Sequence, residues 1–132
     1  MTTPPEISKE NITVILNYIP VFEGEGFEPG EMVTDRGMPY YSYNNEVLNF
    51  VQDLYDNNII YSFDWPAWEK EAENLYNDPE ALASADLDTL RKLLTVHVRK
   101  DRFSEGHLAD VIRDGHVLDI LRGLKGLVGF RS

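Results

Sequence analysis

Apolar residues recur every three or four positions along most of the chain, which is the spacing of an amphipathic α-helix. The clearest case follows Asp86, where Leu87, Leu90, Leu94 and Val98 fall on one helical face. Runs of this kind predict helices over residues 8–19, 44–58, 63–78, 86–103, 104–115 and 116–127, with a short helical turn at 78–85. Because no convincing run of strands interrupts them, we predict an all-α fold of five or six helices.

Capping and breaking residues mark the ends of these helices. A side chain that can accept a hydrogen bond from the first turn precedes most of them, and we expect it to act as the N-cap. The predicted caps are Ser8, Asn44 or Asn45, Asp64, Asp78, Asp86 and Ser104. Pro20 is expected to end the first helix, and Gly115 to end the helix at 104–115.

Residues 22–44 interrupt the helical pattern with a segment rich in Glu, Gly, Pro and Tyr. We predict a long acidic loop there, within the helical domain, with room for a short hairpin that turns at Asp35-Arg36-Gly37. Loops of this length are often functional.

The length and composition fit one globular domain, and we predict a single domain over residues 1–132. The chain contains no cysteine, which excludes disulfides, thiolate metal sites and a cysteine nucleophile. The first ten residues lack the basic and apolar regions of a signal peptide, and no apolar run reaches the roughly 18 residues of a membrane span. We therefore expect a cytoplasmic protein without a membrane partner.

The net charge of −11 is distributed unevenly along the chain. Residues 1–90 hold 18 acidic and 3 basic side chains, whereas residues 91–132 hold 5 acidic and 9 basic ones. An acidic protein repels nucleic acid at long range, so we expect no nucleic-acid partner. The oppositely charged parts are expected to attract each other within the fold, and self-association of the chain stays open.

The densest run of charge lies at residues 99–107. On the predicted helix, Arg91, Arg99 and Arg102 fall on the polar side, the last two near the C-terminus, where the helix dipole favours cations. His97 and Asp101 fall instead in the middle of the leucine face, one turn apart. A carboxylate on the core side needs a partner, and we expect a cation from elsewhere in the chain or a protonated His97.

The residues that follow leave two interpretations of this run open. Glu105 is expected in the first turn of the next helix, and Phe103 is expected to pack between the two helices. The structural interpretation is an ion-pair corner that locks the two helices together. The functional interpretation is a polar pocket in which the arginines hold an anion and a carboxylate or His97 moves protons.

An R-x-D-R-F-x-E-G motif is formed by Arg99, Asp101, Arg102, Phe103, Glu105 and Gly106. It is preceded by the segments FDWPAW and ADLDTL, and Gly115-His116-Val117 opens the helix that follows. In these features the chain resembles a small prokaryotic family known only as a domain of unknown function. The resemblance extends from about residue 12 to residue 124 and implies a mostly helical bacterial or archaeal protein. Because the family has no assigned activity, no catalytic role follows from it.

Histidine and carboxylate side chains also share a face of the helix at 104–115. His107, Asp110 and Asp114 are spaced so that they could ligate a transition metal. The apolar residues of that helix define another face, so we expect these three to point toward water. We predict no metal site and no cofactor.

Aromatic side chains are concentrated in two segments, one with Tyr40, Tyr41 and Tyr43 and the other with Trp65 and Trp68. Rings flanked by acidic residues can bind a basic peptide or a cationic ligand. The alternative is a core role, since tryptophans three residues apart can share a buried face.

Three functions follow from these features. The leading hypothesis is a protein-protein interaction or regulatory module that contacts another protein through the acidic loop and the aromatic segments. The first alternative is a small anionic-ligand binder or enzyme centred on the R-x-D-R-F-x-E-G motif, whose candidate residues are Arg99, Asp101, Arg102, Glu105, His97 and His107. The second alternative is a nucleic-acid-associated factor, in which a helix-turn-helix over residues 104–127 contacts phosphates.

Overall fold

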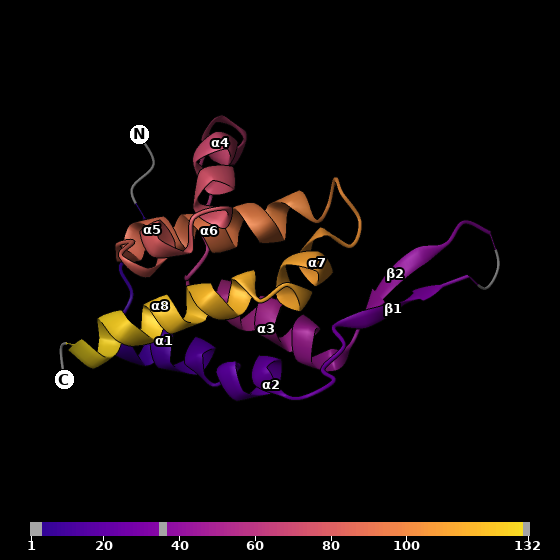
Figure 1. Ribbon diagram of the computed structural model, residues 1–132, viewed down its shortest axis with the longest axis horizontal. Helices are drawn as coiled ribbons and strands as arrows, with labels where there is room; N and C mark the ends of the chain where they lie inside the picture. Colours follow the sequence, from indigo (N-terminus) through magenta and orange to yellow (C-terminus); the bar gives the residue numbers. More distant parts are fainter. Residues whose placement is uncertain (1–3, 35–36, 131–132) are drawn as a thin grey trace.

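The computed structural model describes residues 4–34 and 37–130, most of which are helical (Figure 1). In chain order the elements are α1 (Lys9–Leu16), α2 (Ile19–Glu23), β1 (Gly30–Val33), β2 (Tyr40–Tyr43), α3 (Asn45–Asp56), α4 (Trp65–Tyr76), α5 (Pro79–Ala83), α6 (Leu87–Lys100), α7 (His107–Arg113) and α8 (His116–Phe130). The fold is thus mostly helical, as predicted. The predicted count of five or six helices is wrong, and the predicted loop contains a small sheet.

The start of the chain shows why the helix count differs. Ser8 caps α1 as predicted, because its side chain accepts from the N–H of Asn11, but this helix ends at Leu16. A second short helix, α2, begins at Ile19 and carries Pro20 in its first turn. Proline is tolerated there because the first turn leaves its N–H groups without partners. Pro20 therefore opens a helix, whereas we expected it to end one.

The core is built around α8, which packs against α1, α2, α5, α6 and α7. Its residues Ile120, Leu121 and Leu124 are fully buried. Gly123 of α8 faces Leu90 of α6. A methyl group of Leu90 lies 3.2 Å from the position that a Cβ atom at residue 123 would occupy. This glycine allows the two helices to approach closely. No helix in the described part of the chain is long and apolar enough to span a bilayer.

The strands β1 and β2 pair as an antiparallel hairpin that projects from the helical body (Figure 1). The register places Gly30 opposite Tyr43 and Val33 opposite Tyr40. Asp35 and Arg36, at which we expected the hairpin to turn, lie outside the described residues. The hairpin is attached to α7, since Arg113 donates to the Tyr41 hydroxyl at 2.7 Å.

Candidate functional site

The corner between α6 and α7 is built around Asp101. Its Oδ1 atom accepts hydrogen bonds from the Tyr43 hydroxyl at 2.6 Å and from the backbone N–H of Leu108 at 3.0 Å. The Tyr43 hydroxyl in turn accepts from the N–H of Ala109 at 3.1 Å. Leu108 and Ala109 lie in the first turn of α7, where N–H groups have no partner within the helix. Asp101 and Tyr43 together therefore cap α7 from outside its own sequence.

The prediction that Ser104 caps this helix is wrong. The residue before α7 is Gly106, which adopts a left-handed φ of 84° and has no side chain to act as a cap. Glycine adopts this conformation without the steric strain of other residues. The chain can thus turn sharply after α6 and present the start of α7 to Asp101 and Tyr43.

Two further expectations for this corner are also wrong. The observed partners of Asp101 are a phenol and an amide, whereas we expected a cation or a protonated His97. Phe103 is 81 % exposed and lies beside Trp65, with ring centroids 6.1 Å apart, so it does not pack between α6 and α7.

The corner is not an ion-pair lock either. No ion pair between described residues joins α6 to α7. The carboxylate of Glu105 lies in the turn before α7 and accepts from the backbone N–H of Tyr41 on the hairpin. Asp101 and Glu105 of the motif thus hold the hairpin and the start of α7 in place.

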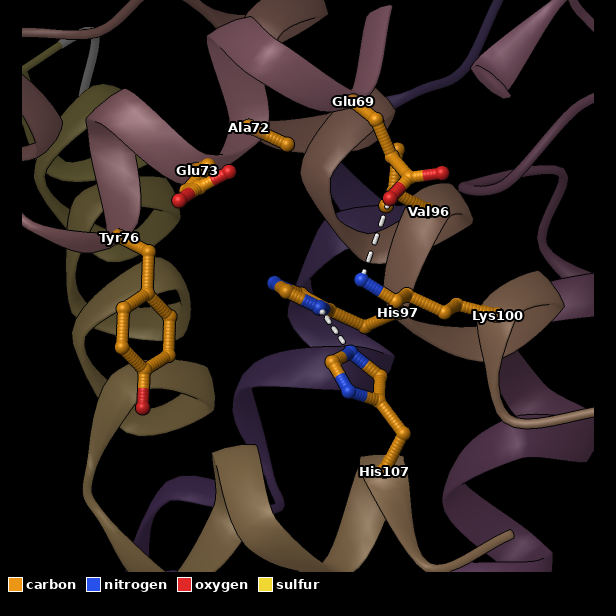
Figure 2. Close-up of a pocket in the computed structure, with 8 residues that line it drawn as sticks. All are labelled: Glu69, Ala72, Glu73, Tyr76, Val96, His97, Lys100 and His107. Atoms are coloured by element: carbon orange, nitrogen blue, oxygen red, sulfur yellow. Dashed lines mark hydrogen bonds and ion pairs between the residues drawn. The ribbon is translucent and has the colours of Figure 1, made fainter. Parts of the chain in front are cut away.

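The three histidines of the chain meet at another side of the α6 C-terminus. His97 Nδ1 lies 2.9 Å from His107 Nε2, in hydrogen-bond contact (Figure 2). The ring of His97 also meets the ring of His116 edge to face, with centroids 4.9 Å apart. His116 also packs against Tyr76, with centroids 4.6 Å apart. Helices α4, α6, α7 and α8 each contribute one of these aromatic rings.

Two of the histidines are buried with an unpartnered nitrogen. His97 is 4 % exposed and His116 is 6 % exposed, and the Nε2 atom of each has no hydrogen-bond partner among the described residues. Leaving a buried polar atom without a partner costs about 1–3 kcal/mol. Folded proteins contain few such atoms, so each of them requires an explanation.

A cavity of about 200 Å³ opens beside these histidines, between α4, α6 and α7. We call it the histidine pocket, and it is lined by Glu69, Ala72, Glu73, Tyr76, Val96, His97, Lys100 and His107. Figure 2 shows the second ring nitrogen of His97 pointing toward the space between Glu73 and Tyr76. Lys100 lies at the same opening and forms an ion pair with Glu69, with 3.2 Å between Nζ and Oε2. The pocket therefore combines imidazole, phenol, ammonium and carboxylate groups.

Burial keeps these histidines neutral. It lowers the pKa of His97 well below 6.5, and the neighbouring His116, His107 and Lys100 lower it further. Burial also lowers the pKa of His116. For His107 burial again lowers the pKa, although Asp101 and Glu69 act in the opposite direction.

A neutral pair of hydrogen-bonded imidazoles can relay a proton. If His97 Nδ1 donates to His107, then His97 Nε2 carries a lone pair and can accept a hydrogen bond. If His97 Nδ1 accepts, then His97 Nε2 carries the hydrogen and can donate it. His97 Nε2 can thus be either an acceptor or a donor, and because this atom is buried, a molecule in the pocket reaches it when the neighbouring side chains move.

The remaining predicted site residues lie elsewhere. Arg99 and Arg102 flank Tyr55 of α3, away from the histidine pocket. Trp65 and Trp68 are partly buried and pack against the core, as do the rings of Tyr43 and Tyr55. Tyr40 is exposed on the hairpin.

Asp110 and Asp114 do not join His107 in a common site. Asp110 lies 4.0 Å from Arg113, and Asp114 accepts a hydrogen bond from the Tyr76 hydroxyl. Within the described ranges, no group of three or more His, Asp or Glu side chains has the arrangement of a metal site.

A comparison with protein families places this arrangement in context. The sequence model of a family of unknown function (DUF6508) matches residues 7–129. The chain belongs to this family. The match agrees with the resemblance noted from the sequence, while the motif as a family signature and a prokaryotic origin stay predictions. No curated protein and no solved structure matches the chain, so the function of this DUF6508 member has to be argued from its own residues.

Proposed function

We propose that this protein binds a small polar ligand in the histidine pocket and exchanges a proton with it through His97 and His107. The observation that carries the proposal is the unpartnered Nε2 atom of His97, buried beside the cavity while Nδ1 contacts His107. A hydroxyl, amine or carbonyl group of a ligand would supply the missing hydrogen bond. The bound ligand would then explain why the His97 Nε2 atom has no hydrogen-bond partner within the protein.

The surrounding groups support proton exchange. General acid-base catalysis needs a group within reach of the ligand whose pKa lies near the working pH. Because the pKa of His97 lies well below 6.5, His97 does not retain the proton and passes it through Nδ1 to His107. His107 is only half-buried and so connects the buried His97 to solvent. Lys100 and Glu73 offer opposite charges to orient a polar ligand. The volume of about 200 Å³ suits a ligand smaller than a drug-sized molecule.

Nitrogen-15 NMR of the histidine rings tests this proposal. The probes are a panel of alcohols, amides and hydroxy acids of two to four carbon atoms. We expect binding probes to shift the ring nitrogens of His97 and His107 and to change their tautomers. His97→Phe should abolish the shift of the His107 ring nitrogens, whereas the distant Arg122→Gln should preserve it. Probes that bind both variants equally, or that leave both rings unshifted, would contradict the proposal.

A second function, contact with another protein, is favoured by the hairpin. Met32, Met38 and Tyr40 are 56 %, 88 % and 53 % exposed on this projecting element. Exposed apolar side chains that gather on one element are typical of protein interaction sites. Glu25 and Glu31 of the segment 22–44 are exposed and favour a basic partner surface, whereas Glu23 and Glu28 already pair with arginines of the chain.

Affinity capture with paired variants tests this second function. We expect a partner to be retained by the wild-type protein and by His97→Phe, and to be lost from the double variant Met38→Ser, Tyr40→Ser. A partner that the double variant retains equally well would contradict a role for the hairpin.

The nucleic-acid alternative is less well supported, because two of the arginines that would contact phosphates already form ion pairs. Arg113 pairs with Glu28, and Arg122 pairs with Glu23 at 2.7 Å. These ion pairs would have to open before either arginine could contact a phosphate.

A further inference from the structure

Arg102 of the R-x-D-R-F-x-E-G motif lines a second cavity, and Arg99 lies beside the ring of Tyr55, which lines it too. This groove, of about 370 Å³, lies between α3, β2 and the ends of α6 and α7. It takes Val98 from α6 and Arg102 from the turn that continues α6, whereas the histidine pocket uses Val96, His97 and Lys100. At 100° per residue these sets occupy different faces of one helix. The groove is therefore separate from the histidine pocket.

The groove combines an apolar floor with a cationic rim. The floor is lined by the aliphatic side chains of Leu48, Val51, Val98 and Leu108. Of these, Leu48 is exposed to solvent. An exposed leucine beside a concave apolar surface is available to cover a ligand, whereas a single exposed leucine on a convex surface needs no explanation.

The positive charge at this rim is not neutralised by the fold. Arg102 donates to the Tyr55 hydroxyl at 3.4 Å, and the Arg99 guanidinium lies 5.7 Å from the centre of the Tyr55 ring. Neither arginine forms an ion pair with a carboxylate in the described ranges, although Lys92 and Lys100 on the same helix do. The chain has 23 acidic residues for 12 basic ones. Two guanidinium groups that both contact Tyr55 and lack a carboxylate partner are therefore notable.

Asp101 is the one acidic residue that lines the groove. Its Oδ1 atom already accepts from the Tyr43 hydroxyl and from the N–H of Leu108, so its charge is engaged by hydrogen bonds within the fold. Its negative charge is offset by Arg102, which lines the same groove, and Arg99 beside the Tyr55 ring adds a positive charge nearby.

From this combination we infer that the groove binds a small carboxylate with an aliphatic tail. Arg102 holds the carboxylate, since a guanidinium can donate two parallel hydrogen bonds to its oxygens, and Arg99 adds a positive charge nearby. The tail lies along Leu48 and Val51, where it removes apolar surface from water. The volume falls in the range of small-molecule sites. The inference is independent of the histidine pocket and of its proposed function.

Sodium octanoate is the probe, with calorimetry and methyl NMR as the measurements. Octanoate should bind saturably and shift the methyl groups of Leu48, Val51 and Leu108. Acetate, which lacks the tail, and 1-octanol, which lacks the charge, should each bind at least about tenfold more weakly. Arg102→Gln should weaken octanoate binding by about tenfold or more, whereas Lys92→Gln on α6 should leave it unchanged. His97→Phe should also leave it unchanged, which separates this inference from the function proposed above.

Three results would overturn the inference. The first is equal binding of octanoate and 1-octanol, and the second is unchanged affinity in Arg102→Gln. The third is an acidic aliphatic peptide that binds the groove where octanoate does not, since it would assign the site to a protein partner. Arg102 is exposed, so the urea midpoint of Arg102→Gln should equal that of the wild type and show that the variant is folded.

Discussion

Two polar centres lie at the C-terminal end of α6, and they differ in how completely they are partnered. Asp101 accepts from a phenol and from a backbone amide, and it helps to cap α7. One turn earlier, His97 has an unpartnered Nε2 atom, and so has its neighbour His116. The fold explains why Asp101 is polar, but it does not explain the histidines. The comparison teaches that a buried polar group whose partners are missing is the better indication of a ligand site.

Replacing Asp101 should have the largest effect. We expect Asp101→Ala to lower the free energy of unfolding by about 3 kcal/mol, because the Tyr43 hydroxyl and the Leu108 N–H both lose their acceptor. Urea unfolding measures this loss. Tyr43→Phe and the double variant complete a cycle, in which we expect a coupling energy of about 1 kcal/mol. Additive losses would show that the two side chains act separately, and the contrast with the histidines would then weaken.

Lowering the pH should reveal the histidines. Burial lowers their pKa values in the folded chain, so below pH 6.5 the unfolded chain takes up protons that the folded chain does not. Stability is therefore retained above pH 6.5 and is lost as the pH falls, with a slope of up to about 1.4 kcal/mol per pH unit for each histidine. Urea unfolding from pH 7.5 to 5 measures the slope, and His116→Phe should make it shallower. A slope that is the same in both proteins would contradict the burial of His116 in neutral form.

Removing an unpartnered nitrogen should increase stability. His116→Phe keeps a ring against Tyr76 and His97 and eliminates the buried Nε2 atom, so we expect a gain of about 1 kcal/mol at pH 7.5. Thermal and urea unfolding measure it. A loss of similar size would mean that the fold itself needs this imidazole.

The smallest effect should come from the ion pair at the pocket entrance. The side chains of Lys100 and Glu69 are 37 % and 44 % exposed, so we expect Lys100→Gln to change stability by less than about 0.5 kcal/mol. Glu69→Gln and the double variant should agree within the same limit in urea unfolding. A loss above about 1 kcal/mol would place this pair with Asp101, among the groups that the fold requires.

Local features of the chain could be predicted from the sequence, because their partners lie within a few residues. Asp64, Asp78 and Asp86 each cap a helix by accepting from the N–H three residues later, as expected. Ser104 has the same sequence signature, yet α7 takes its acceptors from Asp101 and Tyr43. A short motif cannot reveal a competing acceptor that arrives from another part of the fold.

Features that depend on contacts between residues far apart in the sequence could not be predicted from it. Arg91 falls on the polar side of a helical wheel, but it is buried because its guanidinium donates to the carbonyl groups of Asn58 and Ile59. The charged run at residues 97–107 made His97 and His107 candidates for a ligand site. His116 was noted only as part of the Gly115-His116-Val117 segment that resembles the family. The three lie on three helices, and no spacing along the chain predicts that their rings meet.

The Tyr43 hydroxyl, which caps α7 from the hairpin, also has a kinetic consequence. It contacts Asp101 across 58 residues of sequence and Ala109 across 66, whereas α6, α7 and α8 are neighbours along the chain. Contacts between distant residues form late in folding, because closing a long loop costs entropy before any contact compensates for it. A late contact governs the unfolding rate more than the folding rate. We therefore expect Tyr43→Phe to speed unfolding more than it slows folding, so that the hairpin, although it projects from the core, contributes to the lifetime of the native state.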